Sequence, residues 1–216
     1  MDWDALAERH EARYGDAMVR LPDDPDRRQR QLARAARAAG AAGLARLMDG
    51  RPSEAAGWFA RSAARYRESF DVAPPESWGR LIGALKARLL AGDWSGAETD
   101  ARWALAQGPA ESASPIGRYA AVLAGLVLDG DARSLAAGLV AECPDSFPRP
   151  VACALDALAR HDAAAYAEAV QAVLESFERR DEFLDDVPVA DTVLALEALA
   201  ARRGFAVHPT SALLPE

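Results

Sequence analysis

The spacing of apolar residues around Gly50 constrains the fold of this chain more than any other feature. On both sides of this glycine the residues that can face a core keep the period of an α-helix, first Leu44, Leu47 and Met48, then Ala55, Trp58, Phe59, Ser62, Ala63 and Tyr66. The stretch 40–70 therefore predicts two helices joined by a tight turn. Because such a pair cannot bury both of its faces alone, it needs further helices packed against it, with Trp58 and Phe59 buried between them.

The helix-turn-helix pattern returns at turns centred on Gly92, Gly130 and His161. Half of the 216 residues are hydrophobic, which is enough for a sizeable core. Alanine is abundant and favours closely packed helices, whereas valine, isoleucine and threonine are too sparse for a sheet protein. We therefore expect an all-α fold of about ten helices, arranged as antiparallel hairpins.

The chain is expected to form a single all-helical domain. Residues 1–25 predict an N-terminal helix and loop, 26–180 the hairpins, and 181–216 a C-terminal helix and tail. The first helix is predicted over residues 2–19. Asp26 is the predicted N-cap of the second helix, and the last helix is predicted to start after Asp185 and Asp186, with Pro188 in its first turn.

The second hairpin carries the residues of a known repeat: the turn Gly92-Asp93-Trp94, followed by Ala97, Ala104, Leu105 and Pro109. It resembles the second half of a tetratricopeptide repeat, although Ala101 stands where that repeat usually has a large aromatic residue. The opening stretch is similar at Gly50, Ala55 and Phe59, with Arg67 in place of the closing proline. The resemblance implies a degenerate tetratricopeptide-like α-solenoid or a compact helical array.

The end of the chain resembles a second family through Leu194 to Leu199, Arg203-Gly204 and Leu213-Leu214-Pro215. This pattern, an Ala/Leu-rich helix leading through Arg-Gly to a short segment that ends in Leu-Pro, is similar to the C-terminal part of the immunity protein 49 family. The resemblance implies an all-helical bacterial protein that binds and neutralises a cognate toxin. It brings no enzymatic residues with it.

Charge and hydropathy exclude some classes of partner. The net charge of −8 and the isoelectric point near 5.0 disfavour a general nucleic-acid binder, which needs a positive surface to displace counterions. No stretch is long and apolar enough to span a bilayer, and the first residues lack a signal peptide, so we expect a cytoplasmic protein. In that compartment the two cysteines, Cys143 and Cys153, are expected to be reduced thiols.

The sequence nominates no catalytic, cofactor or metal site. His10-Glu11 resembles the start of a zinc-protease helix, but Tyr14 occupies the place of the second histidine, and His10 is interpreted as a boundary residue of the first helix. No nucleophile elbow and no glycine-rich phosphate loop occur. We therefore expect a protein that is not an enzyme and holds no cofactor or metal.

Two features are candidates for binding a partner. Four arginines form a stripe on the second helix, opposite an apolar face of Leu32, Ala36, Ala39 and Gly43; the stripe consists of Arg27, Arg30, Arg34 and Arg37. It either binds phosphate groups or an acidic partner, or it is a solvated helix face balanced by nearby acids, which is the commoner case. Trp94 is the second candidate, because an exposed aromatic residue in a turn suits a protein contact.

A further charged run, Arg179-Arg180-Asp181-Glu182 with Asp185 and Asp186, could hold a cation or a basic partner. The interpretation we favour is that these residues mark helix ends and solvated charge.

The leading hypothesis is a non-catalytic helical scaffold that binds another protein. If the C-terminal resemblance holds, the partner is a toxin, occluded by an acidic surface that faces a basic partner. One alternative is a general tetratricopeptide-like adaptor or regulator of cellular proteins. The other is a helical enzyme with an unrecognised polar pocket. The oligomeric state is left open.

Overall fold

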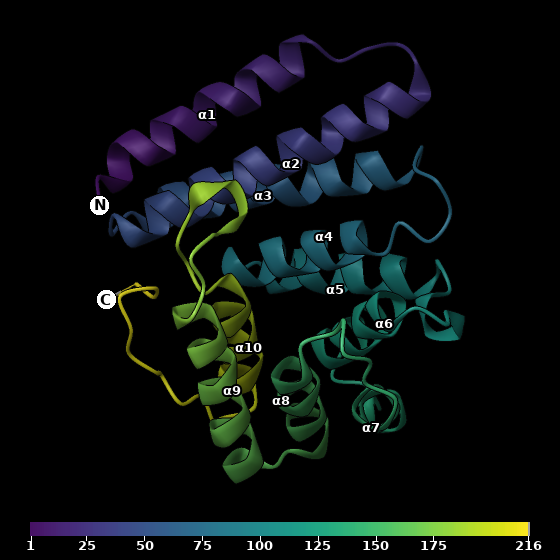
Figure 1. Ribbon diagram of the computed structural model, residues 1–216. Helices are drawn as coiled ribbons and strands as arrows, with labels where there is room; N and C mark the ends of the chain where they lie inside the picture. Colours follow the sequence, from purple (N-terminus) through teal and green to yellow (C-terminus); the bar gives the residue numbers. More distant parts are fainter. Residues whose placement is uncertain (216) are drawn as a thin grey trace. The chain divides into compact units, whose positions relative to one another are not determined.

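The computed structural model describes residues 1–215, which form α-helices joined by turns and two short 3-10 helices, with no strand in that range (Figure 1). In chain order the elements are α1 (Trp3–Val19), α2 (Pro25–Met48), α3 (Pro52–Phe70), α4 (Gly79–Leu90), α5 (Trp94–Leu105), η1 (Pro109–Glu111), α6 (Pro115–Val127), α7 (Arg133–Ala141), α8 (Arg149–Arg160), α9 (Ala163–Glu178), η2 (Leu184–Asp186) and α10 (Asp191–Arg202). The expectation of an all-α fold of about ten helices is confirmed over the described residues.

The helices group into two compact units. The first contains Met1–Gly92, Asp181–Val189 and residues 210–215, and the second contains Asp93–Arg180 and Ala190–Pro209. The first unit therefore consists of α1 to α4 together with η2. The second consists of α5 to α10 with η1.

In the first unit α2 packs against both α1 and α3, and α3 packs against α4 (Figure 1). The helix starts follow ordinary capping. The Asp2 side chain accepts a hydrogen bond from the Ala5 N–H at the start of α1, and Asp24 accepts one from the Arg27 N–H at the start of α2. The predicted cap of the second helix, Asp26, is instead the second residue of the helix, where its carboxylate accepts hydrogen bonds from the Gln29 and Arg30 side chains.

Close packing around α2 depends on small residues. The apolar face that the sequence predicts is confirmed, since all four of its members are buried: Leu32, Ala36, Ala39 and Gly43. A Cβ atom added at Gly43 would lie 2.7 Å from the Phe59 ring, which is itself 1 % exposed. Phe59 is therefore buried as expected, whereas Trp58 is half-buried, edge-on to Tyr14 with 5.5 Å between ring centroids.

In the second unit each helix from α5 to α10 packs against the next, and α8 also contacts α6 and α10. A carboxylate on α10 fixes the segment that follows this helix. Glu197 accepts hydrogen bonds from the Tyr166 hydroxyl at 2.7 Å, the Val207 N–H at 3.0 Å and the His208 N–H at 2.6 Å. The Phe205 ring packs edge-on against Tyr166. The segment after α10 therefore folds back onto α9 and α10.

Two predicted turns adopt the backbone that the pattern requires. Gly50 and Gly92, which occupy equivalent places in the two best hairpins, have φ angles of +72° and +66°. In this left-handed region glycine carries no steric cost. The predicted start of the last helix, with Pro188 in its first turn, is wrong. In the structure α10 begins at Asp191, and Pro188 lies before it. The intervening segment is extended, and its residues Val187 and Val189 are buried.

Candidate functional site

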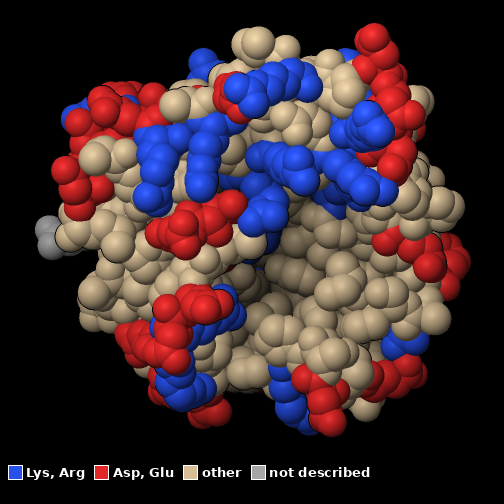
Figure 2. Space-filling view, turned by 45° about the horizontal axis from the view of Figure 1, so that its top comes forward, with Lys and Arg blue, Asp and Glu red and all other residues tan. Residues whose placement is uncertain are grey.

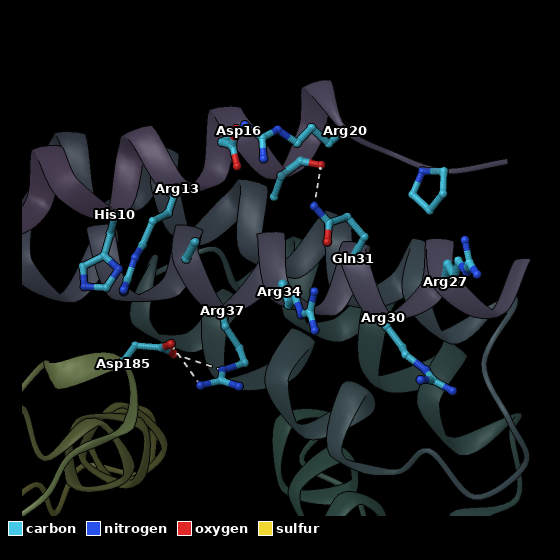
Figure 3. A pocket seen from close by; sticks show the side chains of 13 residues that line it. His10, Arg13, Asp16, Arg20, Arg27, Arg30, Gln31, Arg34, Arg37 and Asp185 are labelled. Atoms are coloured by element: carbon cyan, nitrogen blue, oxygen red, sulfur yellow. Dashed lines mark hydrogen bonds and ion pairs between the residues drawn. The ribbon is translucent and has the colours of Figure 1, made fainter. Parts of the chain in front are cut away.

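A pocket of about 750 Å³ lies in the first unit, between α1 and α2, and six arginines line it (Figure 3). Arg13 lies on α1 and Arg20 is the C-cap of that helix, whereas the other four lie on α2: Arg27, Arg30, Arg34 and Arg37. The lining also contains His10, Asp16, Gln31 and Asp185. We call this site the arginine pocket. Figure 2 shows basic side chains gathered on one face of a protein whose net charge is −8.

The arginine stripe reaches the pocket because of its spacing. Arg27, Arg30, Arg34 and Arg37 are three, four and three residues apart, which places them on one side of a helix whose other side is buried. The four arginines that the sequence selected as a possible binding surface therefore line a single pocket.

The sequence interpretation missed the second wall of the pocket, although a signal for it exists. The same three, four and three spacing recurs along α1 and its C-cap, at His10, Arg13, Ala17 and Arg20. The Gln31 amide donates to the Ala17 carbonyl oxygen at 3.3 Å and joins the second turn of α2 to the last turn of α1. Side chains with matching spacing on the two neighbouring helices thus line the same pocket. The sequence shows each set separately, and only the packing of the helices brings the two sets together.

The charges in the pocket are only partly balanced. Asp26 pairs with Arg30 at 2.7 Å and Asp16 pairs with Arg20 at 2.9 Å. Asp185 accepts two hydrogen bonds from Arg37, from Nε at 3.0 Å and from Nη2 at 2.9 Å. The other three guanidinium groups are exposed and form no ion pair with a described carboxylate, namely those of Arg13, Arg27 and Arg34.

Asp185 comes from η2, which is 148 residues further along the chain than Arg37. Its φ angle of +57° lies in the left-handed region, as does that of Asp186 at +59°. Asp185 was interpreted as solvated charge at a helix end, and this is wrong: its side chain is only 21 % exposed and binds an arginine through both oxygens. A segment distant in the sequence therefore supplies one of the carboxylates that line the pocket.

His10 is the other residue whose surroundings differ from the sequence interpretation. It is buried, with 1 % exposure, and not at the boundary of the helix face. Neither ring nitrogen has a hydrogen-bond partner among the described residues. Burial lowers the pKa of His10, and the positive charges of Arg13 and Arg9 lower this pKa further, while the charge of Asp185 and its nearby backbone raise it. At neutral pH the imidazole is therefore uncharged and presents one N–H donor and one acceptor.

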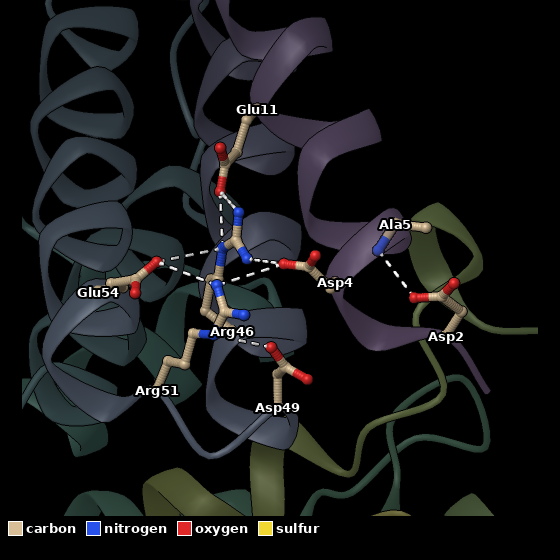
Figure 4. A network of polar contacts seen from close by, with 8 residues as sticks. All are labelled: Asp2, Asp4, Ala5, Glu11, Arg46, Asp49, Arg51 and Glu54. Carbon is tan, nitrogen blue, oxygen red and sulfur yellow. Dashed lines mark hydrogen bonds and ion pairs between the residues drawn. The ribbon is translucent and has the colours of Figure 1, made fainter.

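An ion-pair network centred on the buried Arg46 side chain holds α1 against α2 outside the pocket (Figure 4). The Arg46 side chain, 7 % exposed, binds Glu11 at 2.8 Å and also pairs with Asp4, both on α1. The hydrogen bond that Arg46 donates to the Glu11 carboxylate is the largest cause that raises the pKa of Arg46. Because residues early in α1 bind a residue late in α2, the two helices are antiparallel. This network fixes the register in which their arginine stripes face each other.

Trp94 does not line the arginine pocket. It belongs to the second unit, where it is the first residue of α5, and it is half-buried. The Arg202 guanidinium lies over its ring, 4.6 Å from the centroid. The tryptophan is therefore partly covered by an intramolecular cation–π contact.

Among residues 1–215, no group of three or more His, Cys, Asp or Glu side chains could hold a metal ion. In the same range no helix has the length and apolar character needed to cross a membrane. Comparison of the chain with models of known protein families, with curated proteins and with solved structures gave no match. The tetratricopeptide and immunity resemblances therefore stay predictions, and the arginine pocket is the feature from which a function can be argued.

Proposed function

We propose that this protein is a non-catalytic helical scaffold that binds an acidic segment of another protein in the arginine pocket. The observation that carries the proposal is the set of three exposed guanidinium groups, on Arg13, Arg27 and Arg34, that line the pocket without a described carboxylate partner. Guanidinium groups form strong, planar hydrogen bonds with carboxylates. An acidic segment would supply the missing partners.

The Arg37–Asp185 pair supports the same chemistry, since it is a carboxylate held through both oxygens on the pocket wall. Asp185 belongs to a segment distant in sequence from α2. Its contact with Arg37 therefore resembles the contact that a carboxylate of a bound partner would make. The protein's own structure thus supplies an example of the contact that we propose for the partner.

The length of the pocket favours a chain over a small anion. Arg27 and Arg37 are ten residues apart, about 15 Å along a helix that rises 1.5 Å per residue. An extended peptide advances about 3.3 Å per residue, so about five residues would span this distance. A single carboxylate or inorganic anion would reach only part of the stripe.

The toxin-neutralising form of the hypothesis rests on the C-terminal resemblance alone. In that form an acidic surface faces a basic toxin, whereas the arginine pocket suits a partner of the opposite charge. If the partner is a toxin, we propose that an acidic segment of it enters the pocket. The adaptor alternative uses the same pocket for acidic segments of cellular proteins.

The test measures binding of a labelled peptide, Asp-Gly-Gly-Glu-Gly-Gly-Asp, by fluorescence anisotropy at low salt. One variant removes the exposed pocket arginines: Arg13→Gln, Arg27→Gln and Arg34→Gln. A matched variant removes three exposed arginines of the second unit and changes the net charge equally: Arg102→Gln, Arg149→Gln and Arg179→Gln.

We expect the pocket variant to lose about tenfold or more in affinity, since hydrogen bonds to charged groups are worth about 1.5–3 kcal/mol. The matched variant should bind like the wild type. Equal losses in the two variants, or equal binding of a peptide with Asn and Gln in place of the acids, would exclude the arginine pocket as the acidic-segment site.

A further inference from the structure

The two ends of the arginine pocket differ in chemistry. The Gln31 to Ala17 hydrogen bond and the antiparallel course of the helices place Arg13 across from the part of α2 that carries Arg34 and Arg37. Figure 3 shows His10 and Arg13 together at the end where Arg37 meets Asp185, with Arg27 and Arg30 at the other end. We call the first of these the His10 end.

The His10 end lacks partners for more than one group. Asp185 pairs with Arg37 there, which leaves the guanidinium groups of Arg13 and Arg34 with no described carboxylate. His10 is 1 % exposed, and neither of its ring nitrogens makes a hydrogen bond of ordinary geometry with a described residue, although the backbone of Asp185 lies close enough to raise its pKa. Burying an imidazole without hydrogen bonds is costly, so an unpartnered histidine on a pocket wall indicates a group that binds there.

A carboxylate would satisfy only part of this set. It carries one negative charge on two oxygens, whereas a phosphoryl group carries nearly two charges on three acceptor oxygens. Two guanidinium groups and one imidazole N–H match the charge and the number of acceptors of a phosphoryl group. Arginine clusters are the usual means by which proteins recognise such groups.

We propose that the His10 end of the pocket recognises a phosphorylated side chain, carried by the acidic segment whose binding is the proposed function on which this inference rests. The phosphoryl oxygens accept hydrogen bonds from Arg13 and Arg34, and the His10 ring donates one more. Asp185 stays on Arg37 and limits the positive charge at this end, so that the dianion is matched by the two remaining guanidinium groups.

The source of the phosphoryl group follows from the rest of the pocket. Arg27 is seven residues from Arg34, about 10 Å along α2, and also has no described carboxylate partner. In an extended chain an acidic residue three positions from the phosphorylated one covers about the same distance. A free phosphate would leave Arg27 without its partner, whereas a phosphorylated acidic segment satisfies both ends.

The experiment compares three peptides that differ only at their centre: Asp-Gly-Gly-X-Gly-Gly-Asp, with X phosphoserine, Glu or Ser. Binding to the full chain is measured by titration calorimetry. We expect the phosphoserine peptide to bind about tenfold more tightly than the Glu peptide, because its charge-assisted hydrogen bonds are more numerous. The Ser peptide should bind most weakly.

Three single variants locate the effect. Arg13→Gln and Arg34→Gln should each remove most of the preference for phosphoserine over Glu, and both side chains are exposed, so the fold tolerates the change. The matched variant Arg30→Gln is on the same helix, but its side chain pairs with Asp26 and lies at the other end, so it should keep the preference.

The outcomes separate this inference from the proposed function. If the Glu peptide binds as tightly as the phosphoserine peptide, the phosphoryl site is wrong and the acidic-segment pocket stands. If none of the peptides binds, the proposed function fails as well. If inorganic phosphate alone binds as tightly as the phosphoserine peptide, the site takes a free anion, and recognition of a phosphorylated segment is wrong.

Discussion

At the scale of single residues, the arginines of the pocket differ in what already binds them. Arg37 is held by Asp185 through two hydrogen bonds, whereas Arg13 and Arg34 have no described carboxylate partner. Asp185 achieves this contact with a left-handed backbone, which costs a residue other than glycine some free energy. The pair therefore acts as an internal competitor for any carboxylate that approaches Arg37.

Replacing Asp185 with asparagine should strengthen binding of the acidic peptide by about fivefold, since the change frees Arg37 and removes a negative charge from the pocket. Fluorescence anisotropy measures the effect. The control is Asp186→Asn, which makes the same charge change at an exposed neighbouring residue. If both variants gain equally, the effect is one of long-range charge and Asp185 is no competitor.

His10 provides a test by pH. Burial and the charges of Arg13 and Arg9 lower the pKa of His10 in the folded state. Below about pH 6.5 the His10 imidazole is therefore protonated in the unfolded chain while it is still neutral in the folded protein. The free energy of unfolding should therefore fall as the pH drops through this range and level off below the folded-state pKa.

Urea unfolding between pH 7.5 and 5 should show a smaller decline for His10→Asn than for the wild type. His208→Asn is the control, because that side chain is 84 % exposed and should leave the decline unchanged. A wild-type decline that persists in His10→Asn would mean that other groups cause it.

At the scale of the helices, the register of α2 depends on close contacts that only small residues permit. A methyl group on Gly43 would meet the Phe59 ring at 2.7 Å, and both residues are buried between α2 and α3. Sequence periodicity predicted the apolar face that contains Gly43, but the ring against it belongs to another helix. The need for glycine at this position follows from the packing.

Gly43→Ala should therefore lower the free energy of unfolding by about 1–3 kcal/mol, the usual cost of overpacking a core. Gly15→Ala is the matched change, since nothing lies within 4 Å of the added atom on the exposed face of α1. It should stabilise the protein by up to about 1 kcal/mol through helix propensity. Chemical denaturation distinguishes the two, and a stable Gly43→Ala protein would show that Phe59 has room to move.

Local sequence also set most helix boundaries, with two informative failures. Asp24, not Asp26, caps α2. Both residue positions suit a cap by sequence, and the backbone conformation before Pro25 decides which of them is the cap. The start of α10 was placed too early because Pro188 is typical of a first turn, whereas the segment before Asp191 is extended and buries two valines. Tertiary burial of that segment outweighed the local preference.

At the scale of the whole molecule, a net charge of −8 contrasts with a pocket lined by six arginines and two aspartates. The overall field repels an acidic peptide, while the pocket attracts it at short range. We expect attraction to dominate, since the contacts lie within a Debye length of about 10 Å at 0.1 M salt. The affinity for the acidic peptide should then fall as salt is raised from 50 to 500 mM.

The affinity for the acidic peptide should not fall with salt in the variant that lacks Arg13, Arg27 and Arg34, which serves as the control. Titrations at several salt concentrations provide the measurement. An affinity that rises with salt would mean that repulsion by the whole protein exceeds attraction in the pocket, and it would contradict binding of an acidic segment there.

The sequence by itself determined the all-α class, the hairpin turns at Gly50 and Gly92 and the arginine stripe on α2, because each depends on period and backbone preference within one helix or turn. Tertiary structure decided that the stripe faces a second one on α1, that Asp185 reaches Arg37 across 148 residues, and that His10 is buried without partners. These contacts depend on the register between separate helices. Buried packing and the Arg46 ion pairs set that register, and no local sequence pattern encodes it.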